Sequence, residues 1–126
     1  MSIKYTVNEK INPLKPDEKR KWYATAKTAG DTTLRTLSKD IAARSTVSAA
    51  DTQAVLTALT EVLVEYLADG KIVRLGDFGA FQVRISSQGA QTEDKFNASL
   101  IKSNKVVFRP GIDIKEMLKT LKYEKD

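Results

Sequence analysis

The residue types that carry most enzyme chemistry are missing from this chain, which has no histidine and no cysteine among its 126 residues. Thiolate zinc sites, imidazole bases and the Ser-His or Cys-His pairs of nucleophilic catalysis need one or both of these residues. The acidic residues form no paired-carboxylate motif, and no P-loop or Gly-x-Gly-x-x-Gly sequence accompanies them. We therefore expect no enzyme activity, no metal ion or other cofactor, and no small-molecule substrate.

Cationic side chains are the main chemical groups that remain. Lys and Arg number 21 against 16 Asp and Glu, which gives a net charge of +5 and a pI near 9.4 and favours a polyanionic partner. Bases exceed acids in residues 1–30 and again from Phe81 onward, whereas no Lys or Arg lies between Arg44 and Lys71. This middle segment is therefore not expected to lie along phosphates.

Strands and then helices are predicted in the first 70 residues. Residues 3–7 alternate apolar and polar side chains, and residues 21–26 form a second candidate strand after a turn-rich stretch, so the two could pair as a hairpin. A helix is expected from Leu34 onward, and Ser48 opens a longer helix that ends near Ala68. The apolar stripe of the longer helix consists of Val55, Leu56, Leu59, Val62, Leu63, Tyr66 and Leu67.

A long hairpin and a short helix are predicted in the second half. Strand-like segments on either side of the polar residues 86–94 form the hairpin, whose distal part has too few apolar side chains to pack on a core. Asp113 and Glu116 can cap a short helix, after which residues 122–126 are expected to fray. These elements predict an α+β fold.

Two motifs in the second half point to a family. They are Gly76-Asp77-Phe78-Gly79-Ala80-Phe81 and Phe108-Arg109-Pro110-Gly111-Ile112-Asp113-Ile114-Lys115. In this order, with two helices before them and a long polar hairpin between them, they resemble the bacterial HU and integration host factor family over about residues 32–121.

The resemblance implies an intertwined homodimer with a two-helix base, an antiparallel sheet with protruding β-hairpin arms, and a short C-terminal helix. The arms of this family wrap the minor groove of double-stranded DNA. The glycines then form the bend where a strand leaves the dimer, and Phe78 and Phe81 fill a core shared by two subunits. Ordinary packing is the favoured role for both phenylalanines, with no ligand assigned to them.

The resemblance also implies a set of DNA-binding cations. Arg84, Arg109 and Lys115 fall on matching basic positions, and Lys95, Lys102 and Lys105 lie on the same arm, where a gap of about two residues leaves their register open. For all of them the alternative is a solvated cation on an exposed hairpin.

The sequence departs from the family at the tip of the arm and after Gly111. Residues 92–95 contain no proline to wedge between base pairs, and Ile112 stands where a lysine is usual. Phe96 is the nearest apolar side chain, and we expect it to pack along its own hairpin. The protein is therefore expected to bend DNA less sharply than proline-tipped relatives do.

Residues 1–30 extend beyond the usual family domain, which we assign to residues 31–126. We interpret the extension as an added β-hairpin that pairs with or covers a sheet edge, in preference to a second DNA-contacting surface. Trp22 is expected to pack within it.

The expected function is a histone-like, nucleoid-associated protein that binds DNA without sequence specificity and contributes to DNA condensation and chromosome organisation. The start of the sequence lacks the apolar core of a signal peptide, and no stretch approaches a membrane helix, so we expect a cytoplasmic protein of the bacterial nucleoid with no membrane partner. Two alternatives stay open: a protein-interaction module on the same fold, and a helix-turn-helix regulator beginning at Ile41. The lack of cations after Ser48 argues against the regulator.

Overall fold

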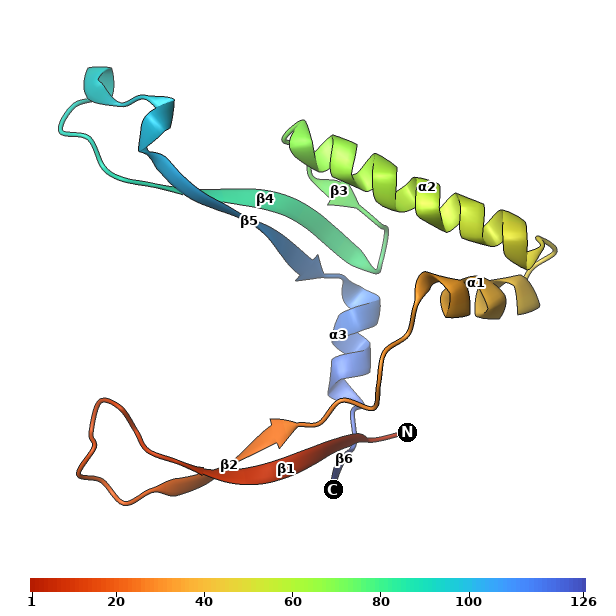
Figure 1. The fold of residues 1–126 in the computed structure, drawn as a ribbon, viewed down its shortest axis with the longest axis horizontal. Coiled ribbons are helices and arrows are strands. Elements are labelled where there is room, and N and C mark those ends of the chain that lie inside the picture. Colours follow the sequence, from red (N-terminus) through yellow and green to blue (C-terminus); the bar gives the residue numbers. More distant parts are fainter. The chain divides into compact units, whose positions relative to one another are not determined.

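The computed structural model describes every residue from Met1 to Asp126 and divides into two compact units. One unit combines Met1–Thr33 with Met117–Asp126, and the other is Leu34–Glu116. Each unit contains one three-stranded sheet, and all of α1 and α2 lie in the second, so the chain has a mixed α+β fold (Figure 1). None of its helices combines the length and apolar character needed to cross a membrane.

Two helices open the larger unit. α1 spans Leu34–Ala43 and α2 spans Ala49–Ala68. The Asp51 backbone N–H donates to the Ser48 hydroxyl at 3.1 Å, so Ser48 satisfies one of the donors that the first turn of a helix leaves unpaired. Both predicted helices are confirmed. They could be predicted because apolar spacing and a capping residue are signals within the helical segment itself.

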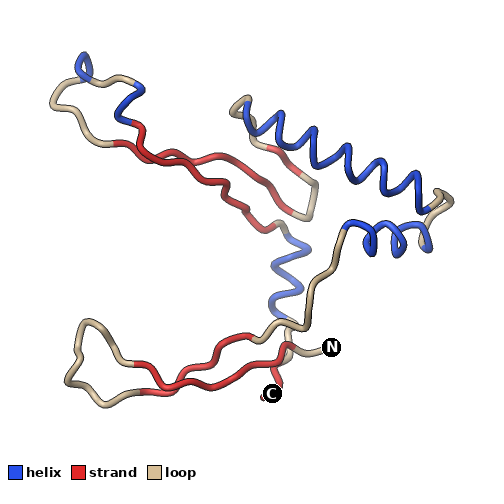
Figure 2. The backbone as a smooth tube through the Cα atoms, viewed as in Figure 1, coloured by secondary structure: helices blue, strands red, loops and turns tan.

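An antiparallel sheet completes most of this unit. Its strands are β3 (Val73–Arg74), β4 (Gly79–Ser87) and β5 (Ile101–Pro110), in that order. β4 and β5 form the long hairpin, which Figure 2 shows as a twisted two-stranded ribbon. The connection between them contains two short 3-10 turns, η1 (Glu93–Lys95) and η2 (Ala98–Leu100). α3 (Ile112–Lys119) begins just after β5.

Two glycines permit the close packing at the base of the long hairpin. A Cβ on Gly79, whose φ is +151°, would lie 2.5 Å from the Arg109 carbonyl oxygen. A Cβ on Gly111 would collide with the Asp77 carbonyl, whereas the bare Gly111 N–H donates to the Phe78 carbonyl at 2.8 Å. The glycines thus let the turn before β4 meet the start of α3 directly.

The smaller unit is built on the N-terminal hairpin, formed by β1 (Ile3–Lys10) and β2 (Lys21–Ala26). The predicted pairing of these strands is confirmed. β1 also pairs in parallel with β6 (Tyr123–Lys125). The prediction that residues 122–126 fray is therefore wrong, because this segment finds backbone partners: the Ile3 N–H donates to the Lys122 carbonyl at 2.7 Å.

Trp22 does not pack within the N-terminal hairpin as predicted, since 65% of its surface is exposed. Its cross-strand neighbour is Glu9, near the turn, whereas β6 covers β1 only from Ile3 to Tyr5. The indole therefore lies beyond the third strand.

The single chain has no buried apolar core. The buried side chains are Ser38 and Thr52, which are polar. Along the predicted stripe of α2, Val55 is 64% exposed and Val62 is 43% exposed. A chain whose helices leave this much apolar surface in water lacks the main stabilising term of folding.

Candidate nucleic-acid interface

The long hairpin has one apolar and one polar side. Directly paired residues share a side, and side chains alternate along each strand. Phe81 is paired with Phe108 and Val83 with Val106 on the apolar side. The other side brings together Gln82, Arg84, Ser86, Ser103, Lys105 and Arg109, together with Ala80 and Val107. We call this second side the cationic face.

Aromatic packing fixes the base of the hairpin. The Phe108 ring centroid lies 4.8 Å from that of Phe81 and 5.5 Å from that of Phe78, both in tilted orientations. Tilted pairs at these separations are a favourable arrangement of aromatic side chains. Phe78 and Phe81 therefore take part in packing within the chain, and their role in a core shared by two subunits stays a prediction.

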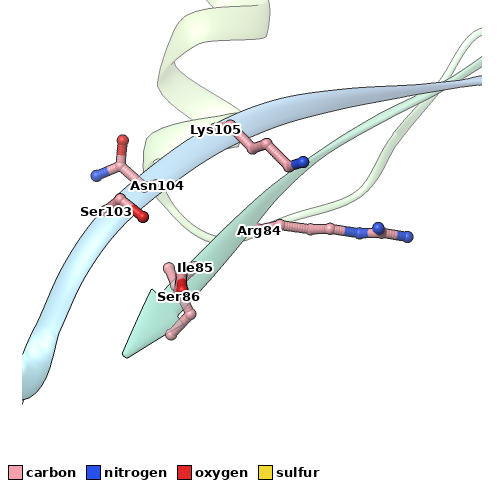
Figure 3. Close-up of a pocket in the computed structure, with 6 residues that line it drawn as sticks. All are labelled: Arg84, Ile85, Ser86, Ser103, Asn104 and Lys105. Atoms are coloured by element: carbon pink, nitrogen blue, oxygen red, sulfur yellow. The ribbon is translucent and has the colours of Figure 1, made fainter. Parts of the chain in front are cut away.

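Arg84 and Lys105 are directly opposite each other on the cationic face. Figure 3 shows both side chains extending to the same side of the ribbon, beside an open hollow of about 350 Å³ that Ser86 and Ser103 also line. Neither cation forms an ion pair within the chain, since the salt bridges involve only Lys15 with Glu18 and Lys27 with Asp126. Like charges directly opposite in a sheet are destabilising, so an anion bound between them would relieve repulsion.

A second cationic row crosses the sheet nearer its base. Arg74 on β3 is paired with Ala80 on β4, and Ala80 is paired with Arg109 on β5. The small alanine separates the two arginines, and a hollow of about 170 Å³ lies among these three residues and the neighbouring glycines. Arg74 is absent from the cations expected from the sequence, although it lies only two residues before the glycine motif that begins at Gly76.

The other selected cations lie elsewhere. Lys95 is in η1 beside Glu93 and Asp94, and Lys115 is in α3, where its N–H donates to the Gly111 carbonyl at 3.0 Å. Lys102 falls at a register irregularity, because Ser86 is paired with Ser103 and Ser87 with Ile101. Register therefore groups Arg84, Lys105 and Arg109 and leaves Lys95, Lys102 and Lys115 outside that group.

The cationic face contains no carboxylate, because neither β4 nor β5 includes an Asp or Glu. Its polar members are Arg, Lys, Ser and Gln, all of which can donate hydrogen bonds to phosphate oxygens. The arrangement suits an extended anionic ligand.

The model of the HU-HIG family, described as an HU domain fused to a wHTH, Ig or glycine-rich motif, matches residues 1–125. The chain belongs to this family. The resemblance found over residues 32–121 is thereby confirmed, and the family match also includes the N-terminal hairpin and β6.

Two solved structures have a similar fold at low sequence identity. A candidate bacterial DNA-binding protein from Bacteroides vulgatus ATCC 8482 matches with a TM-score of 0.66 and 14% identity, covering 98% of this chain and 48% of that one. The Anabaena HU–DNA cocrystal structure matches with a TM-score of 0.56 and 21% identity, covering 71% of this chain and 99% of that one. The chain thus spans about half the length of the Bacteroides protein. No curated protein matches the sequence. These likenesses establish an HU-like fold.

Proposed function

We propose that this HU-HIG protein is a non-sequence-specific architectural DNA-binding protein that grips duplex DNA as a homodimer with its long hairpins as arms. The observation that carries the proposal is the cationic face, where Arg84 and Lys105 lie opposite each other on a ribbon without carboxylates. The Anabaena relative, an HU–DNA cocrystal structure with a similar fold, supports DNA as the partner.

Arg84, Lys105 and Arg109 bind phosphate oxygens in this proposal, and Arg74 joins them through the row that includes Ala80. Arginine adds paired donors that match phosphate geometry, while the serines and glutamine on the same face donate further hydrogen bonds. We also propose contacts to DNA by three cations that lie outside the cationic face, namely Lys95, Lys102 and Lys115. Backbone contacts position a protein on DNA without selecting a sequence, and the arms follow the minor groove.

The homodimer rests on the exposed apolar surface of the helices. A second copy that covers Val55, Leu59 and Val62 supplies the apolar burial that the single chain lacks. Sedimentation at micromolar concentration is expected to show a dimer and little folded monomer. A stable folded monomer at that concentration contradicts this part of the proposal.

Within the proposed protein, residues 31–126 act as the HU-like DNA-binding domain and residues 1–30 as a β-hairpin extension. Its place of action is the bacterial nucleoid, where it contributes to DNA condensation and chromosome organisation. The tip of each arm carries Glu93 and Asp94 in η1 and no proline. These carboxylates repel phosphates, so the proposed complex bends DNA less than proline-tipped relatives do.

Salt titration tests this function. The dissociation constant is measured for two unrelated duplexes of about 30 base pairs, between about 0.05 and 0.3 M salt. The expected result is a steep loss of affinity, about 0.9 log units per log unit of salt for each phosphate neutralised, with the same slope for both duplexes. Absence of binding favours the protein-interaction alternative. Tight binding to only one duplex favours a sequence-specific regulator, although α2 offers no Lys or Arg for such a role.

A further inference from the structure

The N-terminal hairpin also separates its side chains by type. One side of the β1–β2 ribbon carries Tyr5, Val7 and Trp22 among its apolar residues. The lysines of the hairpin strands, Lys4, Lys10, Lys21 and Lys27, all lie on the other side, which we call the lysine face. Lys27 belongs to it because its N–H donates to the Lys4 carbonyl at 2.8 Å, which extends the pairing by one step.

The remaining side chains of the lysine face are also phosphate-binding types. Thr6 is paired with Thr25, and Asn8 with Tyr23, so hydroxyl and amide groups lie between the lysines. These are the uncharged side chains that proteins use beside Lys and Arg to contact phosphate oxygens. Glu9 is the only carboxylate of the two strands, and it lies on the opposite side, paired with Trp22.

The lysine face has an ion pair at one end only. Near β6, Lys27 forms an ion pair with Asp126, whereas Lys4 is in register with Glu124 without an ion pair, because the Glu124 carboxylate accepts a hydrogen bond from the Ser2 hydroxyl. Near the turn, Lys10 and Lys21 are directly opposite each other and neither has an anionic partner in the chain. Such a pair has Cα atoms only about 5 Å apart, so the two charges repel each other along the ribbon.

We propose that the lysine face is a second binding surface for the phosphate backbone of duplex DNA, with Lys10 and Lys21 as its strongest contacts. The inference rests on the proposed function, because it takes DNA as the partner. The lysine face is a different site from the cationic face, because it lies in the N-terminal sheet and outside residues 34–116.

Duplex DNA is the occupant that the geometry favours. The uncompensated cations and neutral donors form an extended two-stranded ribbon, and a ribbon of this width fits a DNA groove with phosphates along both edges. The same combination of an opposed cationic pair, hydroxyls and an amide occurs on the cationic face of the long hairpin.

The test compares Lys21→Gln with Lys125→Gln in the full chain. Each variant removes one positive charge from the same sheet, but Lys125 is paired with Tyr5 and therefore lies on the apolar side. Lys21→Gln is expected to lower the slope of log affinity against log salt by about 0.9 and to weaken binding roughly fivefold to tenfold at about 0.1 M salt. Lys125→Gln is expected to leave the slope unchanged.

Charge reversal supplies a second readout. Lys21→Glu creates an ion pair with Lys10 across the strands, so the melting temperature is expected to stay constant or rise while DNA affinity falls further than in Lys21→Gln. A residue with only a structural role would not move stability and affinity in opposite directions. A fall in melting temperature that accounts for the lost binding overturns the inference.

Arg84→Ala, measured alongside, separates the two proposals. If Arg84→Ala weakens binding and lowers the slope while Lys21→Gln behaves like Lys125→Gln, the second surface is wrong and the proposed function stands. If the wild-type chain shows no salt-dependent binding to duplex DNA, both proposals fail. An equal loss in Lys21→Gln and Lys125→Gln shows a general effect of net charge and also overturns the second surface.

Discussion

The two hairpins share a charge pattern but differ in how they are anchored. Each places two cations directly opposite each other, Arg84 with Lys105 in the long hairpin and Lys10 with Lys21 in the N-terminal hairpin. The long hairpin is fixed at its base by the Phe78, Phe81 and Phe108 rings, whereas the N-terminal hairpin leaves Trp22 exposed. A cationic face therefore follows from strand alternation and register, whatever packs on the other side.

The hairpins also differ in charge compensation. No Asp or Glu occurs in β4 or β5, whereas the N-terminal hairpin has ion pairs from Lys15 to Glu18 in its turn and from Lys27 to Asp126. Internal partners compete with an external anion for the same cations. We therefore expect the long hairpin to contribute more to DNA affinity than the N-terminal hairpin.

The largest expected effect is a loss of stability caused by disrupting the packing at the base of the long hairpin. Gly79→Ala places a Cβ against the Arg109 carbonyl at a positive φ, and we expect the free energy of unfolding to fall by about 3 kcal/mol. Urea denaturation measures the loss. Gly89→Ala is the matched control, since its Cβ meets nothing within 4 Å, and its effect should stay within about 0.5 kcal/mol. Equal stability of the two variants would refute the close packing at Gly79.

The next effect concerns affinity. Arg84→Ala should weaken binding to unrelated duplexes roughly fivefold to tenfold at about 0.1 M salt and lower the salt slope by about 0.9, because one phosphate contact is lost. Arg35→Ala in α1 removes the same charge away from the sheet and should leave the slope unchanged. A loss confined to one DNA sequence would instead indicate contact with bases.

A smaller effect is expected from removing the ion pair between Lys27 and Asp126, to which the long hairpin has no counterpart. Asp126→Asn removes the carboxylate that pairs with Lys27, so stability should fall by less than about 1 kcal/mol, as for a partly exposed ion pair. If the lysine face binds DNA, affinity should rise severalfold because Lys27 is released. Thermal unfolding and a DNA titration on the same samples check both changes. A fall in affinity would contradict competition between Asp126 and DNA.

The smallest expected effect is on DNA bending. Phe96 is 43% exposed beside η1, and we expect Phe96→Ala to leave the end-to-end distance of a bound duplex of about 30 base pairs unchanged. Energy transfer between dyes at the duplex ends measures this distance. A sharp kink that survives Thr92→Ala but disappears in Phe96→Ala would show that Phe96 is a wedge between base pairs.

Local patterns predicted most of the fold. The strand at Lys21–Ala26 and the helix at Ala49–Ala68 were found because alternation, helical spacing and the Ser48 cap lie within a few residues of one another. β6 was missed because its three residues become a strand only by pairing with β1 at the other end of the chain. A short segment carries no periodicity of its own, so its structure depends on distant partners.

The candidate site was only partly predictable for the same reason. The family resemblance predicts Arg84 and Arg109 as DNA-binding cations. That Lys105 lies opposite Arg84 depends on the register of the strands. Arg74 was missed because β3 is two residues long and joins the row only through Ala80. Lys102 could not be placed from the sequence, because a register irregularity occurs at its position.

Mapping the DNA contacts on the full chain by NMR tests the central claim most directly. Backbone amide shifts are compared with and without a saturating duplex of about 30 base pairs. The account predicts the largest changes on the cationic face, at Arg84, Lys105 and Arg109, with little change at Asp51, Thr52 and Gln53 in the first turn of α2. Changes concentrated in that first turn, with none on β4 and β5, would contradict the account and favour a helix-turn-helix mode of binding.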